Sequence, residues 1–142
     1  LGAGHDEILK LALESFPAPK RSVGIVEVGH LNEKRKFAGN PVYDDLAVVF
    51  KDFVTANVSG ILNEWWTLVH NAATGQTGYA TTYKKTATVE FYDPMGDIRS
   101  GASWECIGVW PSSFDPGDAD MSGEDMIRVN VTLTIDKALP LA

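Results

Sequence analysis

The chain has 142 residues, of which 44% are hydrophobic, and a formal net charge of −7. This length predicts a single domain with its own core, and the acidic balance argues against nonspecific binding to nucleic acid or to anionic membranes. The sequence contains one cysteine, which excludes an internal disulfide and a cysteine-based zinc site, and no apolar run reaches the length of a membrane span.

The first segment, His5–Phe16, is rich in Leu, Ala, Glu and Lys, which favour a helix. Asp6 is a suitable N-terminal cap for it. The segment is short, ends before Pro17 and is followed by segments with strand character. Its composition alone therefore predicts a short helix.

The next part of the chain has the pattern of β-structure. Val23–Val28 and Lys34–Ala38 are predicted to form a hairpin that turns at Leu31-Asn32-Glu33. Leu46–Phe50 is a continuous apolar run, which is typical of a strand buried on both faces.

One amphipathic helix is predicted in the middle of the chain. Its apolar residues follow the spacing of a single helical face: Val58, Ile61, Leu62, Trp65, Trp66 and Val69. Asn57 can cap its start, and Gly75 lies shortly beyond its end. Two tryptophans on this face predict that both belong to the core and that the helix docks on a large apolar surface.

Alternation of apolar and polar residues predicts three further strands, at Thr86–Tyr92, Trp104–Trp110 and Met126–Asp136. The first is followed by a turn at Asp93–Asp97, which contains proline and glycine. The second is predicted to end at Pro111, because proline cannot donate a hydrogen bond to a sheet. The whole pattern predicts a β-rich α+β fold with one amphipathic helix.

Few charges protect the edges of these strands. The polar faces of Thr86–Tyr92 and Met126–Asp136 carry mostly Thr and Asn, and only Lys34-Arg35-Lys36 marks a charged hairpin edge. Edge strands of self-contained sheets are usually blunted by charge. The pattern therefore favours sheets that continue between chains.

No arrangement of residues points to catalysis. Nucleophile, phosphate-loop and zinc-protease motifs are absent from the sequence, and His5, His30 and His70 are scattered. Cys106 lies in a predicted strand with large apolar neighbours, which is typical of a buried, inert thiol. We therefore predict no catalytic residue, no cofactor and no metal site.

The acidic loop Asp115–Asp125 is the strongest chemical candidate. Asp118-x-Asp120-x-Ser122-Gly123 matches the opening of an EF-hand calcium loop, but Val129 stands where that loop requires a bidentate Glu. A solvated loop is the preferred interpretation. A monomeric calcium-binding or carbohydrate-binding β-sandwich is the alternative of a different class.

Seven stretches of the sequence, in this order along the chain, carry a resemblance to one protein family. They are Ser22–Val28, Lys34–Asn40, Tyr43–Phe50, the aromatic helix around Trp65, Tyr83–Ala87, Gly108–Ser113 and Ile127–Ile135. Through them the chain resembles the tail tube (inner tube) protein family of contractile-tailed bacteriophages and related contractile injection systems. The resemblance runs from about Ile8 to Lys137.

The resemblance implies an antiparallel β-barrel or sandwich with one flanking amphipathic helix, whose sheets join between subunits in a hexameric ring. It implies a strand over Ile8–Phe16, in place of the helix that the composition predicts. It also implies that residues 1–142 form a single tail-tube domain that lacks its first N-terminal strand.

The function implied by the resemblance is structural. Rings would stack into a hollow conduit for DNA, and an acidic wall would repel the phosphates that pass along it. The implied partners are further copies of the chain, the tail sheath protein, baseplate and tail terminator proteins, and the tape measure protein and genomic DNA in the lumen, without membrane binding by this chain alone. The implied location is the virion tail, assembled in the host cytoplasm. The inner tube of a phage-like bacteriocin and a baseplate tube-initiator paralogue are the related alternatives.

Charges in and beside the predicted hairpin are our candidates for contacts between subunits, since complementary charges set register and partner choice. The candidates are Glu27, Lys34, Arg35, Lys36, Asp44 and Asp45. Polar uncharged residues suited to a wetted lumen are Thr86, Thr88, Thr132 and Thr134.

Overall fold

The computed structural model describes residues 5–52, 57–117 and 127–141. Its strands are β1 (Leu13–Ser15), β2 (Arg21–His30), β3 (Glu33–Tyr43), β4 (Leu46–Lys51), β5 (His70–Asn71), β6 (Gln76–Thr77), β7 (Lys85–Tyr92), β8 (Ile98–Asp115), β9 (Arg128–Thr134) and β10 (Lys137–Pro140). Its helices are α1 (His5–Ala12), α2 (Val58–Val69) and α3 (Ala80–Tyr83). Within these ranges, no helix is both long enough and apolar enough to cross a membrane.

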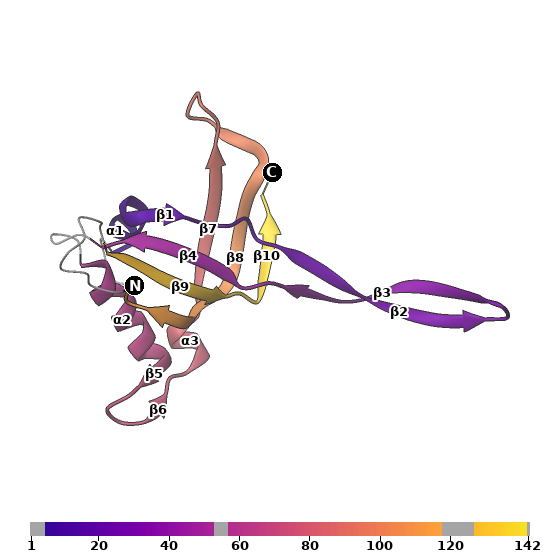
Figure 1. Cartoon of the computed structure of the whole chain (residues 1–142), viewed down its shortest axis with the longest axis horizontal. Coiled ribbons are helices and arrows are strands. Elements are labelled where there is room, and N and C mark those ends of the chain that lie inside the picture. The colour runs from indigo at the N-terminus through magenta and orange to yellow at the C-terminus, as the bar shows by residue number, and fades with distance from the viewer. Residues whose placement is uncertain (1–4, 53–56, 118–126, 142) are drawn as a thin grey trace.

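Six strands form one curled antiparallel sheet. β1, β4, β9 and β8 are neighbours in that order, and β8 also pairs with β10 and β7. β2 and β3 form a separate long hairpin that extends away from the sheet, whereas α1 and α2 lie at the opposite end of the molecule (Figure 1). The β-rich α+β class predicted from the sequence is confirmed.

The core lies between the inner face of this sheet and α2. One cluster of buried apolar side chains unites β4, β8, β9 and α2. Its most deeply buried large members are Leu46, Val48, Val58, Leu62, Val109, Val129 and Val131. Full burial of one such side chain stabilises a fold by about 1.5–3 kcal/mol, so this cluster holds the sheet and helix together.

Helix α2 forms where its periodicity predicts. The Asn57 side chain accepts a hydrogen bond from the backbone N–H of Gly60 at 3.0 Å, so the predicted cap is confirmed. Trp65 is buried, and its indole N–H donates to the carbonyl of Tyr83 at 2.8 Å. Trp66 is only half-buried, because consecutive helical side chains point about 100° apart. The prediction of two core tryptophans is therefore right for Trp65 alone.

The N-terminal segment divides into two parts. The helix predicted from composition is confirmed over His5–Ala12, and Asp6 lies inside its first turn instead of capping it. The strand that the resemblance implied over Ile8–Phe16 is wrong for Ile8–Ala12, and only the three residues of β1 pair with β4. The helix propensity of residues 5–12 explains why they form α1. Backbone pairing with β4 explains why Leu13–Ser15 form a strand.

Strand β8 is much longer than predicted and continues through Pro111. Up to Val109 it pairs with β7 and β10, and from Trp110 onward it pairs with β9. Gly108 has a φ of 73° where the strand changes partners, and the register shifts between Pro111 and Ser113. Proline is tolerated at such an irregularity, so its prediction as a strand end is wrong.

We expect Gly108→Ala to destabilise the protein. A Cβ at this position would collide with the Asp136 carboxylate, which binds the Lys84 ammonium at 2.8 Å, and a left-handed φ costs an alanine about 1–2 kcal/mol. Urea unfolding should show at least that loss. Gly29→Ala is the matched control, because nothing lies within 4 Å of its Cβ, and it should change stability by less than about 1 kcal/mol. Equal effects of the two changes would contradict the strained bend at Gly108.

Two other predictions about strands need correction. Leu46, Val48 and Phe50 of β4 are buried, but Ala47 is exposed, so β4 is buried on one face and not on both. The predicted strand Met126–Asp136 is confirmed as β9, yet β9 lies between β4 and β8 and is therefore no edge. Its Thr and Asn residues face away from the core without marking a free edge.

Candidate assembly surfaces

The β2–β3 hairpin, Arg21–Tyr43, forms a projecting element that we call the arm (Figure 1). Every residue of β2 is exposed, and β3 is exposed except at Gly39 and Tyr43, which are half-buried. An isolated two-stranded hairpin is marginally stable at best in water. The arm therefore presents a surface that the chain itself does not cover.

The register of the arm separates the predicted charged residues onto two faces. Glu27 lies opposite Lys36, and Lys34 lies two residues further along the same face, because side chains of one face recur every second residue. Arg35 pairs with Val28 and so belongs to the other face. Three of the four predicted contact residues in the arm therefore share one face.

The opposite face of the arm carries an apolar stripe made of Val26, Val28 and Phe37. Val26 lies directly opposite Phe37, and the exposed fractions of the three residues are 50%, 48% and 54%. The sequence places these residues in the predicted hairpin, but they are not among the predicted contact residues. The signal was nevertheless present, because a two-stranded hairpin with apolar residues on both faces cannot bury both of them.

The other two predicted contact residues, Asp44 and Asp45, lie at the base of the arm. They are exposed between β3 and β4, and the backbone N–H of Asp44 donates to the carbonyl of Lys20 at 3.0 Å. The structure thus does not bring them together with Lys34, Arg35 and Lys36 near the tip.

Three strands of the curled sheet have a free edge among the described residues. β1 pairs only with β4, and both β7 and β10 pair only with β8. Their unpaired N–H and C=O groups can extend a ladder into another chain. The edge expected at Thr86–Tyr92 is thus confirmed as β7.

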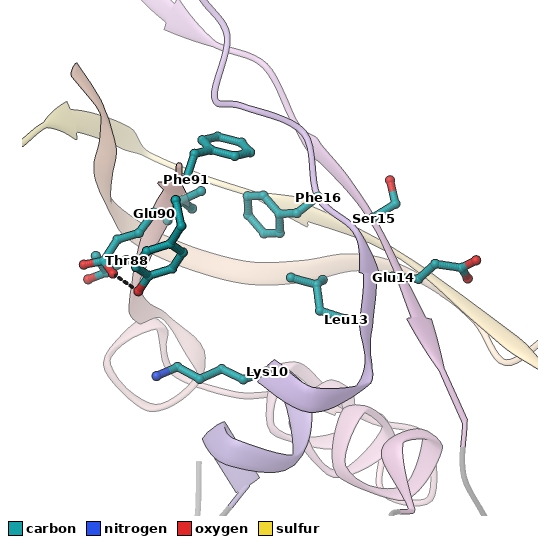
Figure 2. A pocket seen from close by; sticks show the side chains of 10 residues that line it. Lys10, Leu13, Glu14, Ser15, Phe16, Thr88, Glu90 and Phe91 are labelled. Carbon is teal, nitrogen blue, oxygen red and sulfur yellow. Dashed lines mark hydrogen bonds between the residues drawn. The ribbon is translucent and has the colours of Figure 1, made fainter. Parts of the chain in front are cut away.

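Strands β1 and β7 flank a cavity of about 910 Å³, which we call the seam (Figure 2). Leu13 and Phe16 line it from the β1 side, and Val89 and Phe91 line it from β7. In Figure 2 the Phe16 side chain lies between Leu13 and Phe91, and Lys10 extends along the lower end. The seam is therefore an apolar opening between β1 and β7, two of the three strands with a free edge.

The charged groups around the seam are only partly satisfied within the chain. Arg128 holds the Glu14 carboxylate at 2.8 Å, and the Tyr92 hydroxyl donates to the Glu90 carboxylate at 2.7 Å. That hydrogen bond, together with the negative charge of Glu90, raises the pKa of Tyr92. Across the described ranges, neither Glu90 nor Lys10 forms an ion pair.

The remaining candidates for chemistry lie apart from these surfaces. Cys106 is completely buried, as predicted, and burial raises the pKa of its thiol, which keeps it protonated and unreactive at neutral pH. His5, His30 and His70 fall in α1, β2 and β5, and no three potential metal ligands cluster in the described parts of the chain. The EF-hand-like residues Asp118–Gly123 lie outside the described residues.

Comparisons with known proteins give matches at the level of structure only. No protein-family model matches the sequence, and no curated protein does. A chain in the cryo-EM structure of the anti-feeding prophage tube-terminating cap is similar, with a TM-score of 0.72, 15% identity and coverage of 92% of this chain and 80% of that chain.

Two further structures show the same similarity. A chain of the sheath–tube complex of the extracellular contractile injection system PVC has a TM-score of 0.71 and 17% identity, covering 92% of this chain and 80% of that chain. A chain of the 6-fold symmetrised anti-feeding prophage baseplate has a TM-score of 0.69 and 10% identity, covering 92% and 81%. The resemblance read from the sequence is thus confirmed at the level of the fold: this chain shares its architecture with chains found in these contractile injection assemblies.

Proposed function

We propose that the protein is a structural subunit of the tube of a contractile tail. Copies of the chain form hexameric rings, and the rings stack into a hollow conduit. The arm is the observation that carries this proposal, because an exposed hairpin with an apolar stripe and a basic tip needs a partner to cover it. The 6-fold symmetry of the baseplate that contains a similar chain supports the hexameric ring.

The free edges of the curled sheet supply a second means of assembly. β7 and β10 lie on opposite sides of β8, so a subunit can add a neighbour's strand at either side. Strand pairing between identical chains uses backbone hydrogen bonds and therefore carries little side-chain specificity. The charged and apolar side chains of the arm can supply that specificity. Together the two contacts fit a ring whose members are stacked on further rings.

The acidic charge suits a conduit for a polyanion. A net charge of −7 disfavours tight contacts with phosphates, which would stall DNA during ejection. Thr86 and Thr88 are exposed on β7, whereas Thr132 and Thr134 are half-buried on β9. Thr88 lines the seam and Thr86 does not, so Thr86 is the better candidate for a wetted wall. The proposed partners are the sheath, baseplate, terminator and tape measure proteins of such a tail, with genomic DNA in the lumen.

A second candidate function differs only in the cargo. The similar structures belong to the anti-feeding prophage and to an extracellular contractile injection system. This favours, as the alternative to a phage tail, the tube of a phage-like injection particle or its terminating component. The subunit contacts proposed above are the same in both cases.

Light scattering after size-exclusion chromatography, followed by negative-stain electron microscopy, tests the proposal. We expect rings or hollow polymers of the purified chain. A homogeneous 15.4 kDa monomer at high concentration would contradict it. In that case, heat released on titration with millimolar calcium would favour the monomeric calcium-binding sandwich.

A further inference from the structure

We infer that the seam of one subunit is the docking site for the arm of a neighbouring subunit. This inference rests on the proposed self-assembly and names the surface of the neighbouring subunit that receives the arm. In Figure 1 the arm extends away from β1 and β7. The arm that reaches the seam therefore belongs to another copy of the chain.

The first argument is the match of two apolar surfaces. The stripe on the arm consists of Val26, Val28 and Phe37, all about half exposed. The seam offers Phe16 and Phe91 on its two sides, within an open cavity of about 910 Å³. Covering both surfaces at once removes apolar area from water at two places where a single chain leaves it exposed.

The second argument is charge. The arm contains four Lys or Arg and two Glu, a net charge of +2, whereas the whole chain carries −7, which leaves −9 for the remainder. One wall of the seam belongs to the β7–β8 hairpin, residues 85–105, which contains four Asp or Glu and two Lys or Arg, a net charge of −2. A basic arm is thus attracted to an acidic hairpin and is repelled by other arms.

The individual charges fit the same arrangement. In the part of the chain that the structure describes, Lys34, Arg35 and Lys36 form no ion pair, and neither do Glu90 and Asp93. Arg35 lies on the face of the arm that bears the apolar stripe. When that stripe faces the seam, Arg35 faces it as well, whereas Lys34 and Lys36 lie on the opposite face of the arm.

The backbone can contribute to the same contact. β1 and β7 each present an unpaired edge, and both strands of the arm do so as well. An inserted strand would extend the sheet at one of these edges. Because arm and seam are different surfaces, the contact is head-to-tail and repeats from copy to copy, producing a ring or a filament.

Cross-linking between two singly substituted proteins tests the docking. Val26→Cys places a thiol on the apolar stripe, and Thr88→Cys places one in the seam at an exposed position. The two proteins are mixed, allowed to assemble, and treated with a short bismaleimide. With the two variants mixed in equal amounts, each arm meets a seam of the other variant about half of the time. We therefore expect up to about half of the protein to shift to a dimer band that contains one copy of each variant. Native Cys106 stays silent because it is completely buried.

Ile25→Cys is the matched control. Ile25 is the neighbouring exposed residue and lies on the opposite face of the arm, with Glu27. Mixed with Thr88→Cys, it should give little dimer. The pair Val28→Cys and Ser15→Cys repeats the test with a second residue of the apolar stripe and with the β1 side of the seam, in case one of the first variants fails to assemble.

The outcomes separate this inference from the function on which it rests. Assembly by electron microscopy, with cross-links from Val26 and not from Ile25, supports docking in the seam. Normal assembly without a Val26–Thr88 cross-link, or with a stronger Ile25–Thr88 cross-link, overturns the docking site and leaves the tube proposal standing. A wild-type chain that stays monomeric overturns both.

Discussion

Replacing Lys34, Arg35 and Lys36 together with glutamate is expected to leave a folded protein that no longer polymerises. All three residues are exposed on the arm, so their replacement removes no buried contact. The change turns a basic arm into an acidic one on an acidic chain, and like charges brought together across an interface are costly. Circular dichroism should remain that of the wild type, and electron microscopy should show no tubes.

A second variant controls for overall charge. Lys20→Glu, Lys51→Glu, Asn63→Asp and Gln76→Glu together change the net charge by the same amount, at positions outside the arm, the seam and the free edges of β7 and β10. This protein should still assemble, because general self-repulsion changes equally in both variants. Tubes of normal length from the arm variant would refute the role of these three residues.

Trp65→Ala is expected to lower the free energy of unfolding by about 3–5 kcal/mol, which is typical of a large aromatic side chain removed from a core. Trp65 is 6% exposed and packs in the cluster that joins α2 to the sheet. The substitution also leaves the carbonyl of Tyr83 without the indole donor at 2.8 Å. Urea unfolding measures the loss, carried out in the non-polymerising arm variant so that assembly does not add to apparent stability.

Trp66→Ala is the matched control, because Trp66 is the adjacent residue of the same helix and is only half-buried. It should lose clearly less stability than Trp65→Ala. A similar loss at both positions would mean that α2 docks through a different face from the one that the structure shows.

The local patterns of the sequence predict the elements well where burial is one-sided. In α2 and β9 the spacing of apolar residues reports directly which face packs on the core. The pattern fails where the environment changes along an element. Strand β8 changes its pairing partner at Gly108, and this change lets the strand continue past Pro111. From the sequence alone, the proline predicts that the strand ends there.

The surfaces proposed for assembly were predictable only in part. The hairpin and its charges can be read from the sequence, since Lys34, Arg35 and Lys36 follow directly after a turn. The seam could not be predicted, because it depends on which strands end the curled sheet, and that order brings Phe16 and Phe91 to one cavity although they are far apart in the chain. The register of β2 against β3 was likewise needed to show that Arg35 lies on a different face of the arm from Lys34 and Lys36.

A cryo-EM reconstruction of the purified, polymerised chain tests self-assembly most directly. We predict closed rings in which strands of adjacent copies pair along the free edges of β7 or β10, with each arm covered by a neighbouring subunit. Particles in which those edges and the arm all remain exposed to solvent, or a preparation that contains only isolated single chains, would contradict it.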